Sequence, residues 1–174
     1  GKMVSAAQSY FIYGQGAIAG RPVVASADDF TVRGGASDAA IHRKFVHAEQ
    51  MAAEFGLPLI RMIDGTGGGG SVKSLEDMGY TYVPMIPGFE TIAGNLQNVP
   101  VVSLALGPCA GLGAVRVVAS HYSVMFIWLS QVFTAGPAIV APLGETLDKE
   151  GLGGSSIQTR NGVVDDEVVD EAEA

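Results

Sequence analysis

The sequence is poor in several residue types, and each shortage excludes a class of protein. Cys109 is the single cysteine among 174 residues, so the chain cannot form an internal disulfide and fits a reducing compartment. We therefore expect a cytoplasmic protein, or one of the mitochondrial matrix in a eukaryote. Charged residues make up only 16% of the chain, and their net charge of −8 argues against general nucleic-acid binding.

Long hydrophobic runs are also missing. The most apolar segment, 99–114, is interrupted by two prolines and three glycines, so it predicts a buried strand and a turn, with no membrane span. Apolar residues still make up 48% of the sequence, which favours a sheet buried on both faces or a large subunit interface. Because the chain begins with Gly1-Lys2 and ends in an acidic run, we expect it to be part of a larger assembly.

Glycine, in contrast, is abundant, and the stretch 64–73 is the most informative part of the sequence. It follows an apolar segment of strand length, 57–63, and has five glycines in the six positions from 65 to 70. Backbone N–H groups in such a loop can approach a ligand closely, at an entropic cost. A second glycine-rich turn, 107–113, follows the apolar segment 99–106. We expect both turns to open helices and to converge as backbone donors on an anion or oxyanion.

Two phosphate-binding interpretations of the first glycine loop fit less well. Gly65-x-Gly67-x-x-Gly70 matches the dinucleotide fingerprint, but it follows the third expected strand and lacks a well-placed acid. A P-loop requires glycine directly before its lysine, whereas Val72 stands before Lys73. A purely structural glycine turn stays open as an alternative.

Hydrophobic patterning predicts strands that alternate with helices. The expected strands are 21–27, 28–32, 57–63, 99–106 and 122–127, and the expected helices are 37–55, 72–78, 89–96 and 110–119. This order is typical of an α/β protein with a mostly parallel sheet. The acidic run 165–173 is interpreted as the solvated face of a further helix.

Side-chain chemistry for covalent or metal catalysis is poorly supported. The sequence has no Gly-x-Ser-x-Gly motif, and Cys109 fits better as a packed thiol than as a nucleophile. His42 and His47 are five residues apart on the expected helix, so they do not share a face and predict no metal site. Asp28 and Asp29 point to opposite sides of an expected strand, so we expect one structural and one solvated carboxylate.

Five motifs follow one another along the chain. They are 28–35 (Asp-Asp-Phe-Thr-Val-Arg-Gly-Gly), the loop 64–72, 107–113 (Gly-Pro-Cys-Ala-Gly-Leu-Gly), 135–137 (Ala-Gly-Pro) and 152–155 (Leu-Gly-Gly-Ser). Together they resemble the carboxyltransferase component of biotin-dependent acyl-CoA carboxylases, of the propionyl-CoA and methylcrotonyl-CoA type. The resemblance implies an α/β crotonase-like (ClpP/crotonase) fold built as a ββα superhelix. It also implies that 1–174 is a single N-terminal-type domain that lacks the C-terminal domain.

The resemblance implies two groups of site residues. Backbone N–H groups would stabilise the enolate oxygen of an acyl-CoA thioester, with donors in Gly67, Gly68 and Gly69 and a supporting turn at Gly111 and Gly113. The substrate-binding set comprises Phe30, Arg33, Gly34, Gly35, Gly136, Arg43 and Lys44. Within this set the three cations are candidate partners of the coenzyme A phosphates, and each also fits as an ordinary surface cation.

Partners and cofactor follow from the same resemblance. Biotin on a partner protein or domain would carry the carboxyl group, and coenzyme A thioesters would be substrates. The expected partners are a biotin carboxyl carrier, a biotin carboxylase component and a C-terminal carboxyltransferase domain or subunit, in a homo- or hetero-oligomer, with no nucleic acid and no membrane. The main hypothesis is carboxyl transfer from carboxybiotin to an acyl-CoA. An acyl-CoA decarboxylase subunit and a non-catalytic scaffold are the alternatives.

Two positions depart from the family pattern. Ile127-Trp128 occupies the place of a Lys-Gly pair, and Gln158 stands where the family often has histidine. The segment 124–132 is therefore unusually apolar, and we expect Phe126 and Trp128 to be exposed unless an interface covers them. These departures favour the scaffold alternative.

Overall fold

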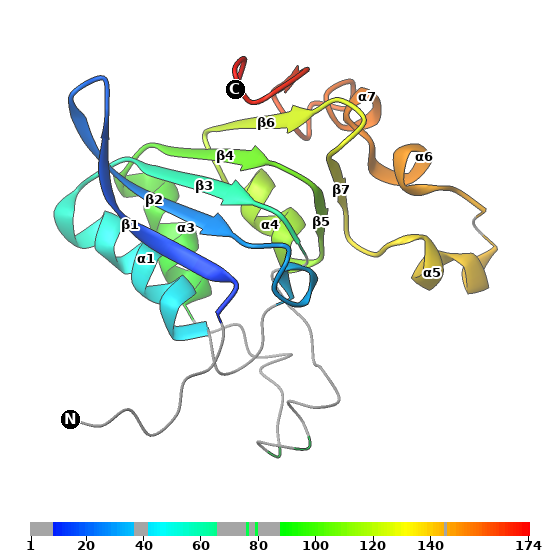
Figure 1. Ribbon diagram of the computed structural model, residues 1–174, viewed down its shortest axis with the longest axis horizontal. Helices are drawn as coiled ribbons and strands as arrows, with labels where there is room; N and C mark the ends of the chain where they lie inside the picture. Colours follow the sequence, from blue (N-terminus) through cyan, green and yellow to red (C-terminus); the bar gives the residue numbers. More distant parts are fainter. Residues whose placement is uncertain (1–8, 37–41, 66–75, 77–78, 80–87, 145) are drawn as a thin grey trace.

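A six-stranded sheet forms the main layer of the protein (Figure 1). The computed structural model describes residues 9–36, 42–65, 76, 79, 88–144 and 146–174. The strands lie in the order β1 (Phe11–Ile18), β2 (Arg21–Asp28), β3 (Leu59–Ile63), β4 (Val101–Ala105), β6 (Tyr122–Phe126) and β8 (Asp166–Val168). β1 is antiparallel to β2, and the other neighbouring pairs are parallel. The expected α/β class with a mostly parallel sheet is confirmed.

Three helices cover one face of this sheet (Figure 1). α1 (His42–Phe55) packs on β1 and β2, α3 (Phe89–Asn98) packs on α1, and α4 (Leu112–Val118) packs on β3 and β4. Residues of β3 and β4 alternate between buried and half-buried, because successive side chains point to opposite faces. On these two strands the face under the helices is buried and the opposite face is half-buried. On β6, residues 123–126 are all buried, so the expectation of a sheet buried on both faces holds for β6 and not for β3 and β4.

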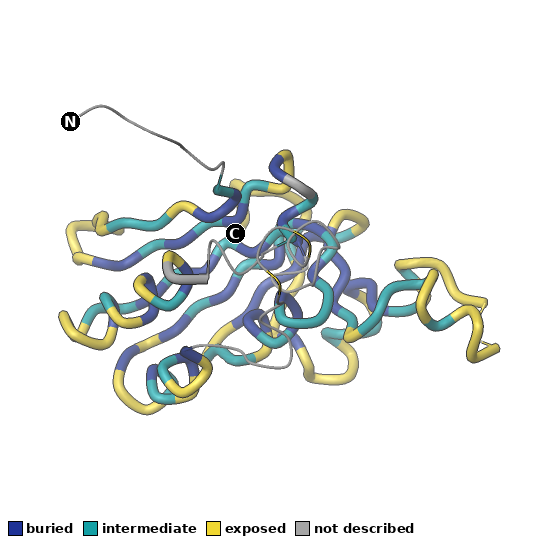
Figure 2. The backbone as a smooth tube through the Cα atoms, turned by 90° about the horizontal axis from the view of Figure 1, so that it is seen from below, coloured by how far each residue is buried: buried dark blue, intermediate teal, exposed yellow. Residues whose placement is uncertain are grey.

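A smaller sheet and an arm lie beyond the main sheet. β5 (Pro108–Ala110) pairs in parallel with β7 (Gln131–Phe133). The chain then extends as an arm, here defined as residues 136–153, which contains α5 (Pro137–Val140), η2 (Ala141–Leu143) and α6 (Lys149–Gly153). Figure 2 shows that much of the arm is exposed. α7 (Ser155–Gln158) returns to the body, where the Gln158 side chain donates to the Val132 carbonyl at 2.6 Å.

Most of the predicted elements are confirmed within one to three residues. The segments 21–27, 57–63, 99–106 and 122–127 form β2, β3, β4 and β6, and 89–96 and 110–119 form α3 and α4. α1 stops where glycine was expected to stop it: Gly56 has φ 61°, and the Leu57 N–H donates to the Ala52 carbonyl at 3.0 Å. The expected start of this helix, 37–41, and nearly all of the expected helix 72–78 lie outside the described residues.

The predicted second strand at 28–32 is wrong. β2 ends at Asp28, because the Asp29 carboxylate accepts the Thr31 N–H at 3.0 Å and the Thr31 hydroxyl at 2.6 Å. Such local bonds favour a turn over a strand. The turn continues into η1 (Arg33–Gly35).

The sequence also does not predict β1, and it misassigns the acidic run. β1 joins β2 through Ala19 and Gly20, whose φ angles of 50° and 77° suit a tight hairpin turn. The run 165–173 contains β8, which pairs with β6, where a helix face was expected. Phe126 is 4% exposed, so its expected exposure is wrong, whereas Trp128 is 82% exposed. Trp128 also has φ 65°, a left-handed conformation that favours glycine.

The hydrophobic core lies between the sheet and its helices. One cluster joins Phe11, Phe45 and Ile92 under α1 and α3, and another joins Ile63, Cys109 and residues of α4 and β6. Among the described residues, no helix is long and apolar enough to cross a membrane.

Candidate functional site

Three glycine positions meet where β2, β3 and β4 end. A Cβ atom added to Gly65 would lie 2.6 Å from the Gly35 Cα atom. A Cβ at Gly35 would lie within 3 Å of the Asp64 carbonyl oxygen, and a Cβ at Gly107 within 3 Å of the Asp64 carboxylate. Real Cβ atoms essentially never approach other heavy atoms so closely, so the backbone contacts of Gly35 and Gly65 require glycine, whereas a Cβ at Gly107 would have to displace the Asp64 side chain. The motifs 28–35 and 107–113 therefore converge in space with Asp64 and Gly65, the described start of the motif 64–72.

Backbone hydrogen bonds connect the same segments. The Leu106 N–H donates to the Ile63 carbonyl at 2.8 Å, and the Ala110 N–H donates to the Gly65 carbonyl at 3.4 Å. The start of the first glycine loop thus contacts the second glycine turn, as the sequence predicted. The remainder of the loop, including the expected donors Gly67, Gly68 and Gly69, lies outside the described residues.

A buried ion pair lies next to the junction of these glycine segments. The Arg116 Nη1 atom on α4 lies 3.0 Å and 2.9 Å from the two carboxylate oxygens of Asp28, at the end of β2. Asp28 in turn accepts the Asp64 N–H at 3.3 Å. The Arg116 guanidinium lies 5.3 Å and 5.1 Å from the ring centres of Phe11 and Phe45, within cation–π range. Burial raises the pKa of Asp28, and the Arg116 charge opposes that rise.

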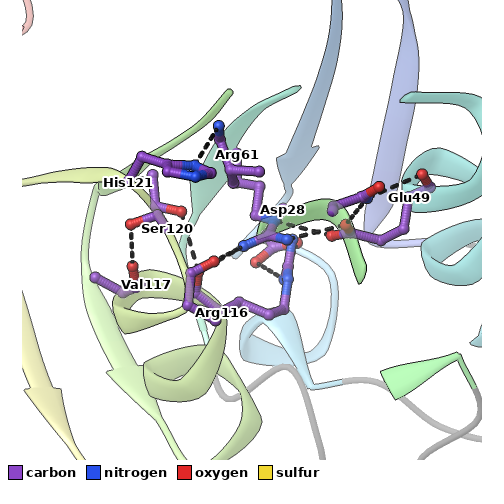
Figure 3. A network of polar contacts seen from close by, with 11 residues as sticks. Asp28, Glu49, Arg61, Arg116, Val117, Ser120 and His121 are labelled. Carbon is purple, nitrogen blue, oxygen red and sulfur yellow. Dashed lines mark hydrogen bonds and ion pairs between the residues drawn. The ribbon is translucent and has the colours of Figure 1, made fainter. Parts of the chain in front are cut away.

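A second buried ion pair lies beside the first (Figure 3). Glu49 on α1 accepts two hydrogen bonds from Arg61 on β3, at 2.8 and 2.9 Å. Arg61 also donates to the Arg116 carbonyl at 3.1 Å, so one cation contacts the backbone that carries the other. Asn95 on α3 donates to the Glu49 carboxylate at 2.8 Å. The network connects α1, α3, α4 and β3 and holds their relative positions.

Sequence reasoning missed this network, although one signal for it exists. Arg61 stands between Leu59 and Ile63 on the buried face of β3, so its charge required a buried partner. Arg116 likewise interrupts an otherwise apolar helix. The sequence does not show which carboxylates pair with them. Asp28 is the structural carboxylate, as expected of one of the two aspartates, while Asp29 bonds within its own turn.

Asp64 differs from the paired carboxylates. Its Oδ1 atom is buried and has no hydrogen-bond partner among the residues that the structure describes. Burial raises the pKa of Asp64, and the neighbouring Asp28 charge raises it further. Because this carboxyl packs against Gly107, it connects the first glycine loop to the second.

The second glycine turn opens α4, as predicted. Gly111 has φ 56°, and its N–H donates to the Phe133 carbonyl at 3.1 Å, which fixes the turn against β7. The N–H groups that follow, including that of Gly113, belong to the first turn of α4, where a helix supplies no backbone acceptor. Gly113 itself is buried within α4, whereas Gly111, Leu112 and Ala114 line the cavity that begins at this turn.

A cavity of about 740 Å³ begins at this turn. It lies between α4, β7 and the arm, and its apolar walls include Val115, Val118, Phe133, Val140 and Leu152. Gln158 and Thr134 are its polar side chains, and none of the described residues that line it is ionisable. Among the described lining residues, a polar ligand group could therefore contact only backbone groups and the side chains of Thr134 and Gln158.

The remaining residues expected to bind substrate have different positions relative to the glycine turns and the cavity. Phe30 is 47% exposed, and its ring is 3.9 Å from the position of a Cβ at Gly34. Gly136 begins the arm, next to the cavity residue Ala135. Lys44 donates to the Phe11 carbonyl at 3.5 Å, which gives it a structural contact. Arg33 and Arg43 belong to η1 and α1, and their side chains lie outside what the structure describes.

Cys109 is a packed thiol, as expected. It is fully buried, and its Sγ donates to the Ile63 carbonyl at 3.3 Å. Burial raises the pKa of the thiol to about 12, so it is not a nucleophile at neutral pH. Within the described part of the chain, no group of three His, Cys, Asp or Glu side chains could hold a metal ion.

Comparison with known proteins identifies the family. The model of the carboxyl transferase domain matches residues 2–174. The chain belongs to the carboxyl transferase domain family. Its fold is also that of the geranyl-CoA carboxylase beta subunit of P. aeruginosa, with a TM-score of 0.80 at 25% identity over 94% of this chain and 30% of that one. The crotonase-like fold expected from the resemblance is thereby confirmed.

Two relatives of this carboxyl transferase domain are named for different activities. The chain is 33% identical over 149 residues to the methylmalonyl-CoA decarboxylase subunit alpha of Veillonella parvula, covering 83% of this chain and 28% of that protein. It is 31% identical over 166 residues to a probable biotin-dependent acyl-coenzyme A carboxylase beta2 subunit of Mycobacterium tuberculosis, covering 94% and 30%. The chain thus spans less than a third of the length of these relatives.

Proposed function

We propose that this carboxyl transferase domain is the acyl-CoA-binding half of a carboxyltransferase that moves a carboxyl group from carboxybiotin to an acyl-CoA. The observation that carries the proposal is the second glycine turn, which opens directly onto an apolar cavity whose described lining has no ionisable side chain. A site of this kind can bind a thioester and stabilise negative charge through backbone N–H groups. It offers no side-chain acid or base of its own.

Enolate chemistry fits these groups. Loss of a proton beside a thioester carbonyl places negative charge on the carbonyl oxygen. N–H groups in Gly67–Gly69 would hold that oxygen, supported by the turn at Gly111 and Gly113, while the apolar walls exclude water and strengthen the electrostatic interaction. Removal of one such donor typically lowers the rate by about 10²–10³-fold. The buried ion pairs keep the strand ends in register, so that the two turns stay close together.

Biotin fits the chemistry of the site, because a base is needed and the described lining supplies none. When bound, carboxybiotin would supply the carboxyl group and a ring nitrogen able to act as the base. We infer that a C-terminal-type carboxyltransferase domain or subunit presents it, and that carrier and biotin carboxylase components complete the assembly. Residues 1–174 would then form a single N-terminal-type domain. Phe30, Gly34, Gly35 and Gly136 would contact the thioester, and the cations Arg33, Arg43 and Lys44 would face the phosphates.

A reconstituted assay tests the proposal. The chain would be mixed with biotinylated carrier, biotin carboxylase, a C-terminal-type carboxyltransferase half and labelled bicarbonate, and labelled acyl-CoA would be measured. We expect transfer with wild type and at least a hundredfold lower kcat with Gly68→Val, because a side chain would displace the backbone donors. Gly14→Ala is the matched control, since a Cβ there meets nothing within 4 Å. Absence of both transfer and acyl-CoA binding would contradict the proposal and leave the scaffold alternative.

A decarboxylase subunit is the second candidate, and the 33% identity to the methylmalonyl-CoA decarboxylase subunit alpha favours it. The same enolate would form by loss of the carboxyl group from the thioester. Product analysis separates the two candidates. A decarboxylase subunit releases the carboxyl group from carboxylated acyl-CoA to carrier biotin without ATP, whereas a carboxylase component builds carboxylated acyl-CoA when ATP and bicarbonate are supplied.

A further inference from the structure

The cavity beside α4 is larger than a short acyl group requires. Its volume of about 740 Å³ lies within the ~300–1,000 Å³ of sites that enclose drug-sized ligands. The space continues from the Gly111 turn along α4 toward the arm, so it is an extension of the site and not a separate hollow.

Its walls are built from aliphatic and aromatic side chains of three different elements. Val115 and Val118 are three residues apart on α4 and form one wall, and Phe133 on β7 lies in the lining as well. Val140 and Leu152 come from the arm. Val118 is 44% exposed and Val163 is 42% exposed, so apolar surface in the cavity remains accessible to a ligand. Burial of such surface favours binding in proportion to its area.

One of the two polar side chains in the described lining, Gln158, is already hydrogen-bonded within the protein. Gln158 donates its side-chain N–H to the Val132 carbonyl at 2.6 Å, which uses the amide to hold α7 against β7. Gln131, next to the lining residue Val132, donates to Glu150 on α6. These contacts hold both glutamine side chains on the protein. A charged ligand group would find no oppositely charged partner there among the described lining residues.

We propose that this cavity is the acyl-group site and that it selects medium- or long-chain acyl thioesters over acetyl and propionyl thioesters. The proposal rests on the proposed function, because the turn at Gly111 and Gly113 is taken to hold the thioester. A thioester carbonyl bound at that turn directs its acyl chain along Val115 and Val118, since Gly111 and these two side chains line one continuous space.

Calorimetric titration of the 174-residue chain with a series of coenzyme A thioesters tests the inference. The series is acetyl-, butanoyl-, hexanoyl- and octanoyl-CoA. We expect Kd to fall by up to about fourfold for each added CH₂ group, in line with the burial of apolar surface. Val118→Asp is expected to raise the Kd of octanoyl-CoA by at least about tenfold, because a charge would stand against the chain. The Kd of acetyl-CoA is expected to change less than twofold.

Two further variants keep the result interpretable. Val163→Asp alters a second exposed wall residue and should act as Val118→Asp does. Val169→Asp is the matched control: this valine is 68% exposed and lines a different hollow, so all Kd values should stay unchanged. Circular dichroism of each variant would establish that the fold is kept.

The outcomes separate the two proposals. Equal Kd values along the series would overturn the acyl-chain inference and leave the proposed function standing. Failure of every coenzyme A thioester to bind would overturn both. If Val118→Asp dissociates a dimer and leaves the chain-length series unaltered, the cavity wall is an interface between copies of the chain and the acyl-chain inference is wrong.

Discussion

Two neighbouring regions of this carboxyl transferase domain differ in their content of ionisable side chains. Under α1 and α4, two buried ion pairs connect Asp28 with Arg116 and Glu49 with Arg61. On the other side of the second glycine turn, the cavity has no ionisable residue in its described lining. The comparison indicates a division of roles. Fixed charge orders the scaffold, whereas the described lining of the cavity presents apolar surface and backbone groups.

The buried pair Asp28–Arg116 provides the largest expected effect. Arg116→Met would leave the Asp28 carboxylate buried without its partner, and we expect the free energy of unfolding to fall by about 3–5 kcal/mol. Urea denaturation measures the change. Arg160→Met, at an exposed position, should have little effect. The double variant Asp28→Asn/Arg116→Met should recover part of the loss, because no unpaired charge remains. A loss below about 1 kcal/mol in the single variant would show that the pair does not order the scaffold.

The glycine junction between the two regions is the next test. Gly35 and Gly34 have φ angles of 65° and 64°, but a Cβ at Gly35 would collide with Asp64, and one at Gly34 would meet nothing closer than 3.9 Å. Gly34→Ala should cost only the left-handed penalty of about 1–2 kcal/mol. Gly35→Ala should cost about 1–3 kcal/mol more, from overpacking. Thermal unfolding of both variants measures the difference, and equal losses would mean that the loops are not in tight contact.

Trp128 lies between β6 and β7, and its replacement by glycine is expected to stabilise the protein. Its side chain is 82% exposed and its φ is 65°, so replacement by glycine removes backbone strain with little loss of burial. We expect Trp128→Gly to raise the free energy of unfolding by up to about 1 kcal/mol, since the entropy of glycine offsets part of the gain. Leu129→Gly, 59% exposed and without positive φ, should lower stability instead. Destabilisation by Trp128→Gly would show that the indole makes contacts worth more than the strain.

Substitution of Asp64 is expected to change the free energy of unfolding least, and the change should depend on pH. Burial and the Asp28 charge raise its folded pKa above the ordinary value of 3.8. The stabilising contribution of this carboxyl is therefore complete below pH 3.8 and is lost as the pH rises through the folded pKa. Asp64→Asn should match wild type in stability at low pH and exceed it at neutral pH, by less than about 1 kcal/mol because water screens this half-buried group. Denaturation at several pH values measures the difference, and a constant offset across pH would contradict it.

The sequence predicted those features that depend on local pattern. Alternation in 57–63 located β3, and Gly56 located the end of α1, because each is decided by neighbouring residues. The convergence of the glycine turns followed from parallel strands that end at one edge of a sheet. Gly67–Gly69 stay a prediction, because these residues lie outside what the structure describes.

Features that depend on distant partners were not predictable. Asp28 and Arg116 are 88 residues apart, and the pattern around neither names the other. β1 contains Gly14 and Gly16, which weaken its strand signal, and it forms because β2 supplies a long partner. The acidic run 165–173 lacks apolar spacing of its own, and its strand β8 is set by pairing with β6. The left-handed backbone at Trp128 likewise follows from the β6–β7 connection and not from the tryptophan.

Chemical labelling of Cys109 would report how often the site opens. The thiol is the single one in the chain, is fully buried and bonds to the Ile63 carbonyl beneath the junction of the glycine turns. A thiol reagent can reach it only when that junction opens, so the modification rate measures how often the site opens in the native protein. A bound thioester that closes the junction would slow the reaction by a factor set by its concentration relative to Kd. Labelling kinetics would thus report ligand occupancy without any catalytic partner.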